Sequence, residues 1–395
     1  MAYDIPDILL GFLGACVYAD PVAFYRALDD AGRARLKREA AERGRKAWLY
    51  RYLYDVLPEA EREDCRRFYL SAQVDAVRDA HELDRLFAEL NAHGLRFAPV
   101  KRADLAFRVY PDAALRRGND WDVWFHPDDC ERALDVLAET GWRVPSRYAD
   151  SNGAVSKTAL HHYSPHVRNH CTLEPHYTLP NFEGVDPREM WSYTLDLPDG
   201  GGRHVLSPEL NLLMLARHAA SKSYYHADLP KLLADAAMVM KHDPVDFAKL
   251  RAMADRWRLP YPGDLLAAFP EFFPAPLIES FRADPAKTDL FRRIFRMRGE
   301  MGDPNTTKLT MARKREKGVA VSFLAHHFLT LGPYRMRGRY HLPAHGAYGR
   351  LCLSYLDYLL TRTGRVFSVL LGRERRLEDY CRLVESVESP ARRSH

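Results

Sequence analysis

The stretch RRGNDWDVWF, residues 116–125, gives the strongest indication of the fold. Its second half alternates polar and apolar residues, which is typical of a β-strand. Side chains two positions apart on a strand point to the same side, so Asp120 and Asp122 should project together while Trp121 and Val123 enter the core. Two converging carboxylates repel each other unless a cation lies between them, and oxygen ligands favour Mg²⁺ or Mn²⁺. The stretch therefore predicts a two-aspartate metal site.

The segments around this stretch alternate between short strands and helices. We predict strands over residues 95–100, 120–125 and 171–177. A helix is predicted over residues 127–140, with Asp128 and Asp129 in its first turn, where acidic side chains suit the helix dipole. Such alternation is typical of an α/β or α+β core.

The two outer parts of the chain have the helical period, and a chain of 395 residues is expected to form two or three packed units. Ser207-Pro208-Glu209 is a good helix start, since Ser can cap and Pro fits the first turn. We predict an α+β protein with a small mixed β-sheet flanked by helical regions. The expected divisions are an N-terminal helical region over 1–93, a catalytic core over 94–204 and a C-terminal helical region over 205–395.

Two further charged residues support a phosphate-transfer site. Glu174 on the strand 171–177 shares a face with Thr172 and His176 and offers a third carboxylate. Lys101 follows an apolar strand and can reach phosphates as a point charge. His176 either orients Glu174 or is a half-buried strand residue. The alternative interpretation of the Asp-x-Asp pair is a solvated strand face or turn, because so short a motif also arises by chance.

Composition restricts the class of protein. The chain is 47% hydrophobic and 28% charged with a formal net charge of +5, which suits a polyanionic ligand such as a nucleotide and is too weak to indicate nucleic acid. Six scattered cysteines without a Cys-x-x-Cys pair argue against a disulfide framework and favour the cytoplasm. No apolar run reaches the length of a membrane span, and the N-terminus lacks the basic region of a signal peptide. The sequence contains no G-x-x-x-x-G-K-[ST] motif, no glycine-rich dinucleotide-binding loop and no G-x-S-x-G motif. These absences disfavour P-loop kinases, dehydrogenases and serine hydrolases.

Two other clusters carry competing interpretations. The histidines at 161, 162, 166, 170 and 176 match no standard zinc spacing, so we favour a polar substrate loop over a zinc site. The basic run 313–317, with Arg335, Arg337 and Arg339, is compatible with RNA or an acidic peptide. Charge runs are usually solvated faces, however, so nucleic acid is only a minor hypothesis.

The chain resembles the bacterial nucleotidyltransferases of a poorly characterised branch of the DNA polymerase β superfamily. The resemblance spans roughly residues 30–260 and rests on order and spacing: PVKR at 99–102, Arg116 before the Asp-x-Asp strand, a helix ending at Gly141-Trp142, and LEPHY at 173–177. The downstream helices with His218 and with LPKLLAD at 229–235 also match.

The resemblance implies Asp120 and Asp122 as metal ligands and Glu174 as the third ligand or general base. It implies Lys101 as a triphosphate contact, and Lys231 and Asp235 as lesser site residues. The alternative interpretation of Lys231 and Asp235 is an ion pair on a helix surface, since they are four residues apart.

Two positions depart from the family pattern. Arg102 stands where the family has a glycine that lets the backbone approach the nucleotide, so either Arg102 contributes charge to the phosphates or the site is weakened. Pro175 within Glu-x-His is unusual in a strand. Arg116 and Arg117 can clamp a phosphate or form an exposed basic turn.

We therefore predict a Mg²⁺- or Mn²⁺-dependent nucleotidyltransferase that moves a nucleoside monophosphate from a nucleoside triphosphate to a hydroxyl of a small molecule or peptide. Asp120, Asp122 and Glu174 are the predicted catalytic and metal-binding residues. Lys101, Arg102, Arg116, Lys231 and Asp235 are the predicted nucleotide-binding residues. The alternatives are a degenerate fold that binds a peptide or protein, and a toxin-like enzyme that modifies tRNA or protein.

Overall fold

In a computed structural model of the protein, the described residues are 8–145, 161–180, 182, 184–197, 201–221, 229–301, 350, 352–353 and 375–388. They form a mixed α+β fold, as predicted, with helices flanking two small sheets. From the N-terminus to the last strand of the larger sheet, the elements are α1 (Ile8–Tyr18), α2 (Pro21–Ala27), α3 (Asp30–Glu42), α4 (Lys46–Leu53), α5 (Glu59–Ala92), β1 (Phe97–Val100), α6 (Arg102–Arg108), a 3₁₀ turn (Ala113–Leu115), β2 (Trp121–Phe125), α7 (Cys130–Glu139), β3 (His166–Arg168) and β4 (Cys171–His176). They continue with α8 (Pro187–Trp191), β5 (Thr194–Asp196), β6 (His204–Leu206), α9 (Pro208–Ser221), α10 (Leu229–His242), α11 (Phe247–Arg256), α12 (Pro262–Leu266), α13 (Ala275–Ser280), α14 (Pro285–Met301) and α19 (Arg375–Glu388).

The larger sheet has the strand order β1-β2-β4-β3. Strands β2 and β4 run parallel, whereas β1 is antiparallel to β2 and β3 is antiparallel to β4. In this register Asp122 lies opposite Val100 on one side and opposite Glu174 on the other. The two central strands therefore bring the predicted Asp-x-Asp motif and the predicted third carboxylate together.

Each face of the sheet packs against a different cluster of apolar side chains. Alternate residues of β2, Trp121, Val123 and Phe125, join a cluster with Leu83, Leu86, Phe87 and Leu90 of α5. Trp124 points to the other face and joins the larger cluster, which includes α1, α9 and α10. Because both faces are covered, all five residues of β2 are buried, including Asp122.

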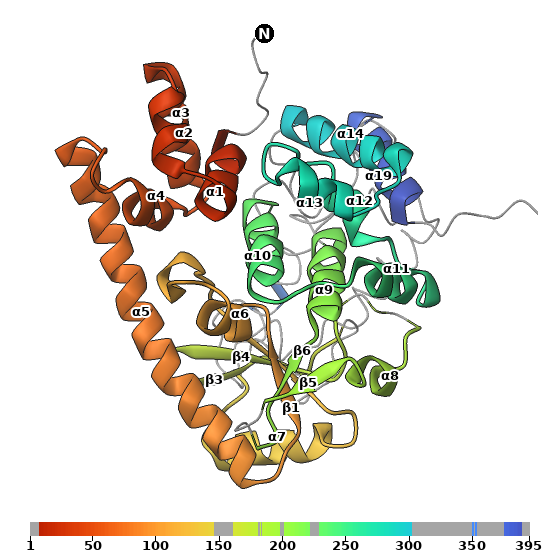
Figure 1. The fold of residues 1–395 in the computed structure, drawn as a ribbon. Helices are drawn as coiled ribbons and strands as arrows, with labels where there is room; N and C mark the ends of the chain where they lie inside the picture. Colours follow the sequence, from red (N-terminus) through yellow and green to blue (C-terminus); the bar gives the residue numbers. More distant parts are fainter. Residues whose placement is uncertain are drawn as a thin grey trace, which may run out of the picture.

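The N-terminal helices reach the sheet through α5, which Figure 1 shows as one long rod running from α4 to α7. Its end at Ala92 is followed by Gly94, which has a φ of +62°. A left-handed glycine just past a helix is the usual terminator, as the His93-Gly94 sequence predicted.

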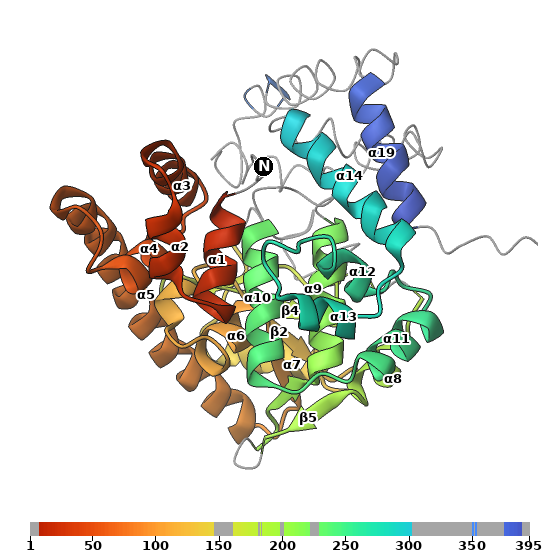
Figure 2. The same cartoon turned by 45° about the horizontal axis from the view of Figure 1, so that its top comes forward.

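The C-terminal helices begin at Ser207, whose hydroxyl accepts a hydrogen bond of 3.3 Å from the backbone N–H of Leu210 and so caps α9 as predicted. Helices α9 and α10 lie side by side, and α1 packs against α10 (Figure 2). In the part of the chain that the structure describes, no helix combines the length and apolar character needed to cross a membrane. The basic run 313–317 and Arg335, Arg337 and Arg339 lie outside the described residues.

Candidate active site

Asp122 is the centre of the polar cluster on the sheet, and its side chain is buried. Its Oδ1 accepts two hydrogen bonds, one of 2.6 Å from Nζ of Lys101 and one of 2.9 Å involving Nε2 of His176. Burial alone would raise the pKa of Asp122, but Lys101 and His176 outweigh it and hold that pKa well below its usual range. Lys101 and His176 therefore hold the Asp122 carboxylate in its ionised form.

Lys101 reaches Asp122 from the end of β1 with an unusual backbone. Its φ is +51° and its ψ is −123°, a region that residues other than glycine rarely occupy. Such strain costs on the order of 1–3 kcal/mol and persists where the surroundings enforce it, often at functional sites. Here the strained residue carries the ammonium that contacts the buried carboxylate.

Glu174 and His176 complete a cluster of possible metal ligands with Asp122. One ligand atom from each of these three side chains lies within 4.8 Å of the others. Nε2 of His176 lies 4.0 Å from the Glu174 carboxylate, so it is closer to Asp122 than to Glu174. Burial, followed by the charge of Asp122, raises the pKa of Glu174. Two carboxylates that share a site in this way are stabilised by a cation between them.

His176 is completely buried, so the interpretation as a half-buried strand residue was wrong. The rings of His161 and His162 lie beside it, with centroids 5.1 and 5.5 Å from that of His176. Burial, followed by the proximity of His176, lowers the pKa of His161 to about 2. Two residues of the predicted histidine-rich substrate loop, His161 and His162, therefore border the carboxylate cluster.

Pro175 lies between Glu174 and His176 in an interior strand. Its carbonyl accepts a hydrogen bond of 2.8 Å from the N–H of Tyr163, and the N–H of Tyr177 donates to the carbonyl of His161 at 3.1 Å. This extra pairing beside β4 attaches the segment with His161 and His162 to the strand. The sheet therefore accommodates Pro175 without moving Glu174 and His176 to different faces.

Asp120 lies just outside β2, which begins at Trp121, one residue later than predicted. Asp120 is exposed, in contrast to Asp122. Its charge nevertheless contributes to raising the pKa of Glu174. The two aspartates thus occupy different environments: one is buried between Lys101 and His176, and the other is at the solvent-facing entrance of the strand.

Arg102, at the position where the resemblance led us to expect a glycine, begins α6 with a helical backbone, so a side chain is tolerated there. Its buried guanidinium pairs with Asp79 of α5 and donates to the carbonyl of Arg116 at 3.2 Å. Gly118 provides the room, because a Cβ there would lie 2.7 Å from Cδ of Arg102. The contacts of Arg102 are therefore with the protein scaffold.

Arg116 and Asp235 form a second buried ion pair, with Nε and Oδ1 2.6 Å apart. The hydroxyl of Tyr110 donates to the same oxygen at 2.7 Å. Because Asp235 is buried, it does not belong to a surface pair on α10, and that alternative was wrong. Lys231 lies half-buried in the first turn of the same helix. The pair connects α10 to the loop that leads into β2.

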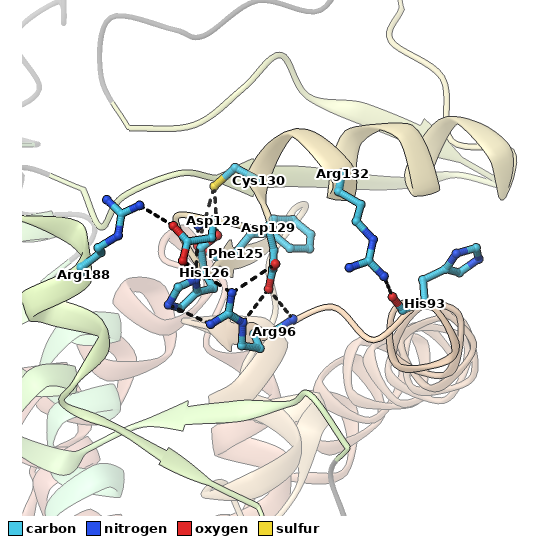
Figure 3. Close-up of polar contacts among 9 residues, drawn as sticks. All are labelled: His93, Arg96, Phe125, His126, Asp128, Asp129, Cys130, Arg132 and Arg188. Atoms are coloured by element: carbon cyan, nitrogen blue, oxygen red, sulfur yellow. Dashed lines mark hydrogen bonds and ion pairs between the residues drawn. The ribbon is translucent and has the colours of Figure 1, made fainter.

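A third polar network lies at the opposite end of β2 and is shown in Figure 3. The Asp129 carboxylate accepts from the backbone N–H of Arg96 at 3.1 Å and from Nε of Arg96 at 2.8 Å. Nη1 of Arg96 lies 3.3 Å from Nε2 of His126, and Asp128 pairs with Arg188. The prediction that Asp128 and Asp129 lie in the first turn of the helix was wrong, because α7 begins at Cys130 and Asp129 precedes it. Asp129 is the N-cap residue of α7, and its carboxylate bonds to Arg96 and not to the backbone of the first turn.

Sequence reasoning placed His176 on the face of Glu174 but did not find its hydrogen bond with Asp122. The sequence did contain an indication of this bond. Asp122 and Glu174 were predicted to lie on neighbouring strands, and His176 shares the face of Glu174. It also missed Asp79 as the partner of Arg102. No local pattern marks Asp79, which lies on another helix of the chain.

One of three comparisons with known proteins finds a match. The model of a family described as uncharacterised nucleotidyltransferase matches residues 33–267, which is more than half of the chain and contains every residue of the cluster. No curated protein matches the chain. No solved structure matches it either. The chain belongs to the uncharacterised nucleotidyltransferase family.

Proposed function

We propose that this protein transfers a nucleoside monophosphate from a nucleoside triphosphate to a hydroxyl group of an acceptor, with release of pyrophosphate. The observation that carries the proposal is the pairing of Asp122 with Glu174 across the parallel strands β2 and β4, next to His176. Membership of a nucleotidyltransferase family supports the reaction class. The acceptor is proposed to be a small molecule or a peptide.

The donor atoms of the cluster fit a divalent cation such as Mg²⁺ or Mn²⁺. Asp122 and Glu174 supply carboxylate oxygens, which both ions accept, and His176 adds an imidazole nitrogen, which suits Mn²⁺ better than Mg²⁺. Asp120 is a further candidate ligand at the solvent side. When bound, the cation would neutralise charge on the triphosphate and lower the pKa of the acceptor hydroxyl.

The side chains of the cluster have distinct proposed roles. Asp122 is held ionised and oriented by Lys101 and His176. Glu174, the carboxylate opposite Asp122, is proposed either to complete the shell of the cation or to accept the proton of the acceptor hydroxyl. Lys101 supplies a positive charge to the triphosphate. The nucleotide-binding roles of Arg102, Arg116, Lys231 and Asp235 stay predictions.

The test is thermal stabilisation by ATP, GTP, CTP and UTP with Mg²⁺ or Mn²⁺, in wild type and in Asp122→Asn. A nucleotide at about 100 times its Kd should add about 2.7 kcal/mol of stability. We expect a cation-dependent shift in wild type that Asp122→Asn loses. Asp64→Asn is the matched control, because Asp64 also pairs with a lysine, Lys46, but on the surface of α5.

Transfer itself is tested with triphosphates that carry label in the α-phosphate. Label that appears in an added acceptor, and not with Asp122→Asn, would support the proposal; label in tRNA or protein would favour a toxin-like enzyme. A folded wild-type protein that no nucleotide stabilises, even with either cation, would contradict nucleotidyl transfer and favour a degenerate binding module.

A further inference from the structure

The carboxylate of Asp122 bonds to Lys101 and also belongs to the cluster that could hold a divalent cation. The ammonium of Lys101 is 2.6 Å from Oδ1 of Asp122, and His176 shares that oxygen at 2.9 Å. Only 12% of the Lys101 side chain and 3% of the Asp122 side chain are exposed. The contact is therefore a buried ion pair and not a transient surface contact.

We propose that Lys101 is an internal competitor for the metal site, which releases Asp122 when a divalent cation binds and then serves the triphosphate. This inference rests on the proposed function, because it assigns the cation to the cluster of Asp122, Glu174 and His176. No bond is made or broken in the exchange: one positive partner of the carboxylate replaces another.

Electrostatics favours the competition. A buried carboxylate needs a compensating positive charge, and Lys101 supplies it. A divalent ion coordinated by either oxygen of Asp122 would lie within a few ångströms of the ammonium, where two positive charges repel strongly in a poorly solvated site.

The backbone fixes where the lysine can go. The register of Val100 opposite Asp122 brings Lys101 to the end of β1 beside the carboxylate, and its strained backbone sets the direction of the side chain. From there the flexible four-carbon stem needs only side-chain rotation to leave Asp122. An ammonium released next to bound metal is well placed for the oxygens of a polyphosphate.

The consequence is that the binding of cation and triphosphate is coupled. The cation frees Lys101 for the triphosphate, and a triphosphate that accepts Lys101 makes Asp122 available to the cation. By linkage each ligand raises the affinity for the other.

The first test measures Mn²⁺ binding without nucleotide, by electron paramagnetic resonance of free Mn²⁺, in wild type and in Lys101→Met. Removing the competitor should raise the Mn²⁺ affinity by about tenfold, within the usual range of coupling between sites. Lys249→Met is the matched control, because Lys249 also pairs with a buried carboxylate, Glu209, at 3.0 Å. The control should leave the Mn²⁺ affinity unchanged.

The outcomes separate this inference from the proposed function. Equal or weaker Mn²⁺ binding by Lys101→Met would overturn the competition while leaving the metal centre in place. No binding by either protein would overturn the metal centre and the competition together.

A second measurement uses the wild-type protein, in case Lys101→Met does not fold. Amine acylation followed by mass spectrometry reports how accessible each lysine is. Mn²⁺ should increase the labelling of Lys101 several-fold without changing that of Lys249. Unchanged or reduced labelling of Lys101 at saturating Mn²⁺ would overturn the inference.

Discussion

The guanidinium of Arg116 donates a hydrogen bond of 2.6 Å to Asp235, which lies 119 residues later in the chain. Both residues are buried, and the hydroxyl of Tyr110 donates to the same carboxylate oxygen. Arg116 belongs to the loop that enters β2, and Asp235 belongs to α10. A buried ion pair therefore connects helix α10 to the loop that enters the strand of Asp122. Loss of either partner would leave the other as an unpaired buried charge.

Removing one member of this pair should destabilise the fold strongly. Asp235→Leu leaves Arg116 as an unpaired buried charge, and we expect a loss of about 3–5 kcal/mol in the free energy of unfolding. The double variant Arg116→Met, Asp235→Leu should lose much less than the sum of the two single variants. Urea unfolding of the four proteins measures this, and simple additivity of the losses would show that the pair is not coupled.

The strained backbone of Lys101 predicts a difference between two substitutions that both remove the ammonium. Lys101→Gly should be more stable than Lys101→Ala by about 1–3 kcal/mol, because glycine adopts a φ of +51° without steric cost. Thermal or urea unfolding in the absence of ligands gives the comparison. Equal stability of the two variants would mean that the backbone at residue 101 relaxes to an ordinary conformation.

The Asp129–Arg96 contact predicts a pH dependence of stability. Burial raises the pKa of Asp129, but the hydrogen bonds from Arg96 outweigh this and lower it below the ordinary value of 3.8. A carboxyl whose pKa is lower in the folded state stabilises the fold above its unfolded pKa, and this contribution is lost as the pH falls through the folded value.

Wild type should therefore lose stability below pH about 4 more steeply than Asp129→Asn, which lacks the titrating group. Urea unfolding between pH 3 and pH 6 measures the slopes. The control is Asp84→Asn, which removes an exposed acid of α5. Identical slopes in wild type and Asp129→Asn would contradict the role of Arg96.

Local patterns predicted much of the core. The alternation around Asp122, the apolar run before Lys101 and the strand around Glu174 each gave a strand, and their order indicated a shared site. Gly94 and Gly141 ended helices as expected, since both have a positive φ. These features depend on neighbours in the sequence, so a single sequence contains them.

Partners distant in the sequence could not be predicted. Nothing near Asp235 indicates Arg116, and nothing near Asp79 indicates Arg102, because each pair depends on how α10 or α5 packs against the sheet. The burial of Asp122 has the same origin. The alternation of polar and apolar residues predicts that one face of β2 is exposed to solvent. Helices cover both faces of the sheet, however, so the whole strand is buried.

The two aspartates of the Asp-x-Asp motif should contribute unequally to cation binding. Asp122 and Glu174 belong to the cluster whose ligand atoms lie within 4.8 Å of one another, whereas Asp120 is exposed and outside it. Without nucleotide, Asp122→Asn and Glu174→Gln should therefore abolish most Mn²⁺ binding, and Asp120→Asn should weaken it less. Electron paramagnetic resonance of free Mn²⁺ measures each affinity.

The effects of these substitutions on turnover should differ from their effects on Mn²⁺ binding. Glu174→Gln removes the proposed proton acceptor and should lower kcat by about 100-fold or more. Asp120→Asn should also reduce turnover, because Asp120 is the proposed further ligand on the exposed side of the site. If Asp120→Asn lost Mn²⁺ binding as completely as Asp122→Asn, the centre would be the two-aspartate site expected from the motif. A merely partial loss would identify Asp122, Glu174 and His176 as the ligands that hold the cation before the nucleotide arrives.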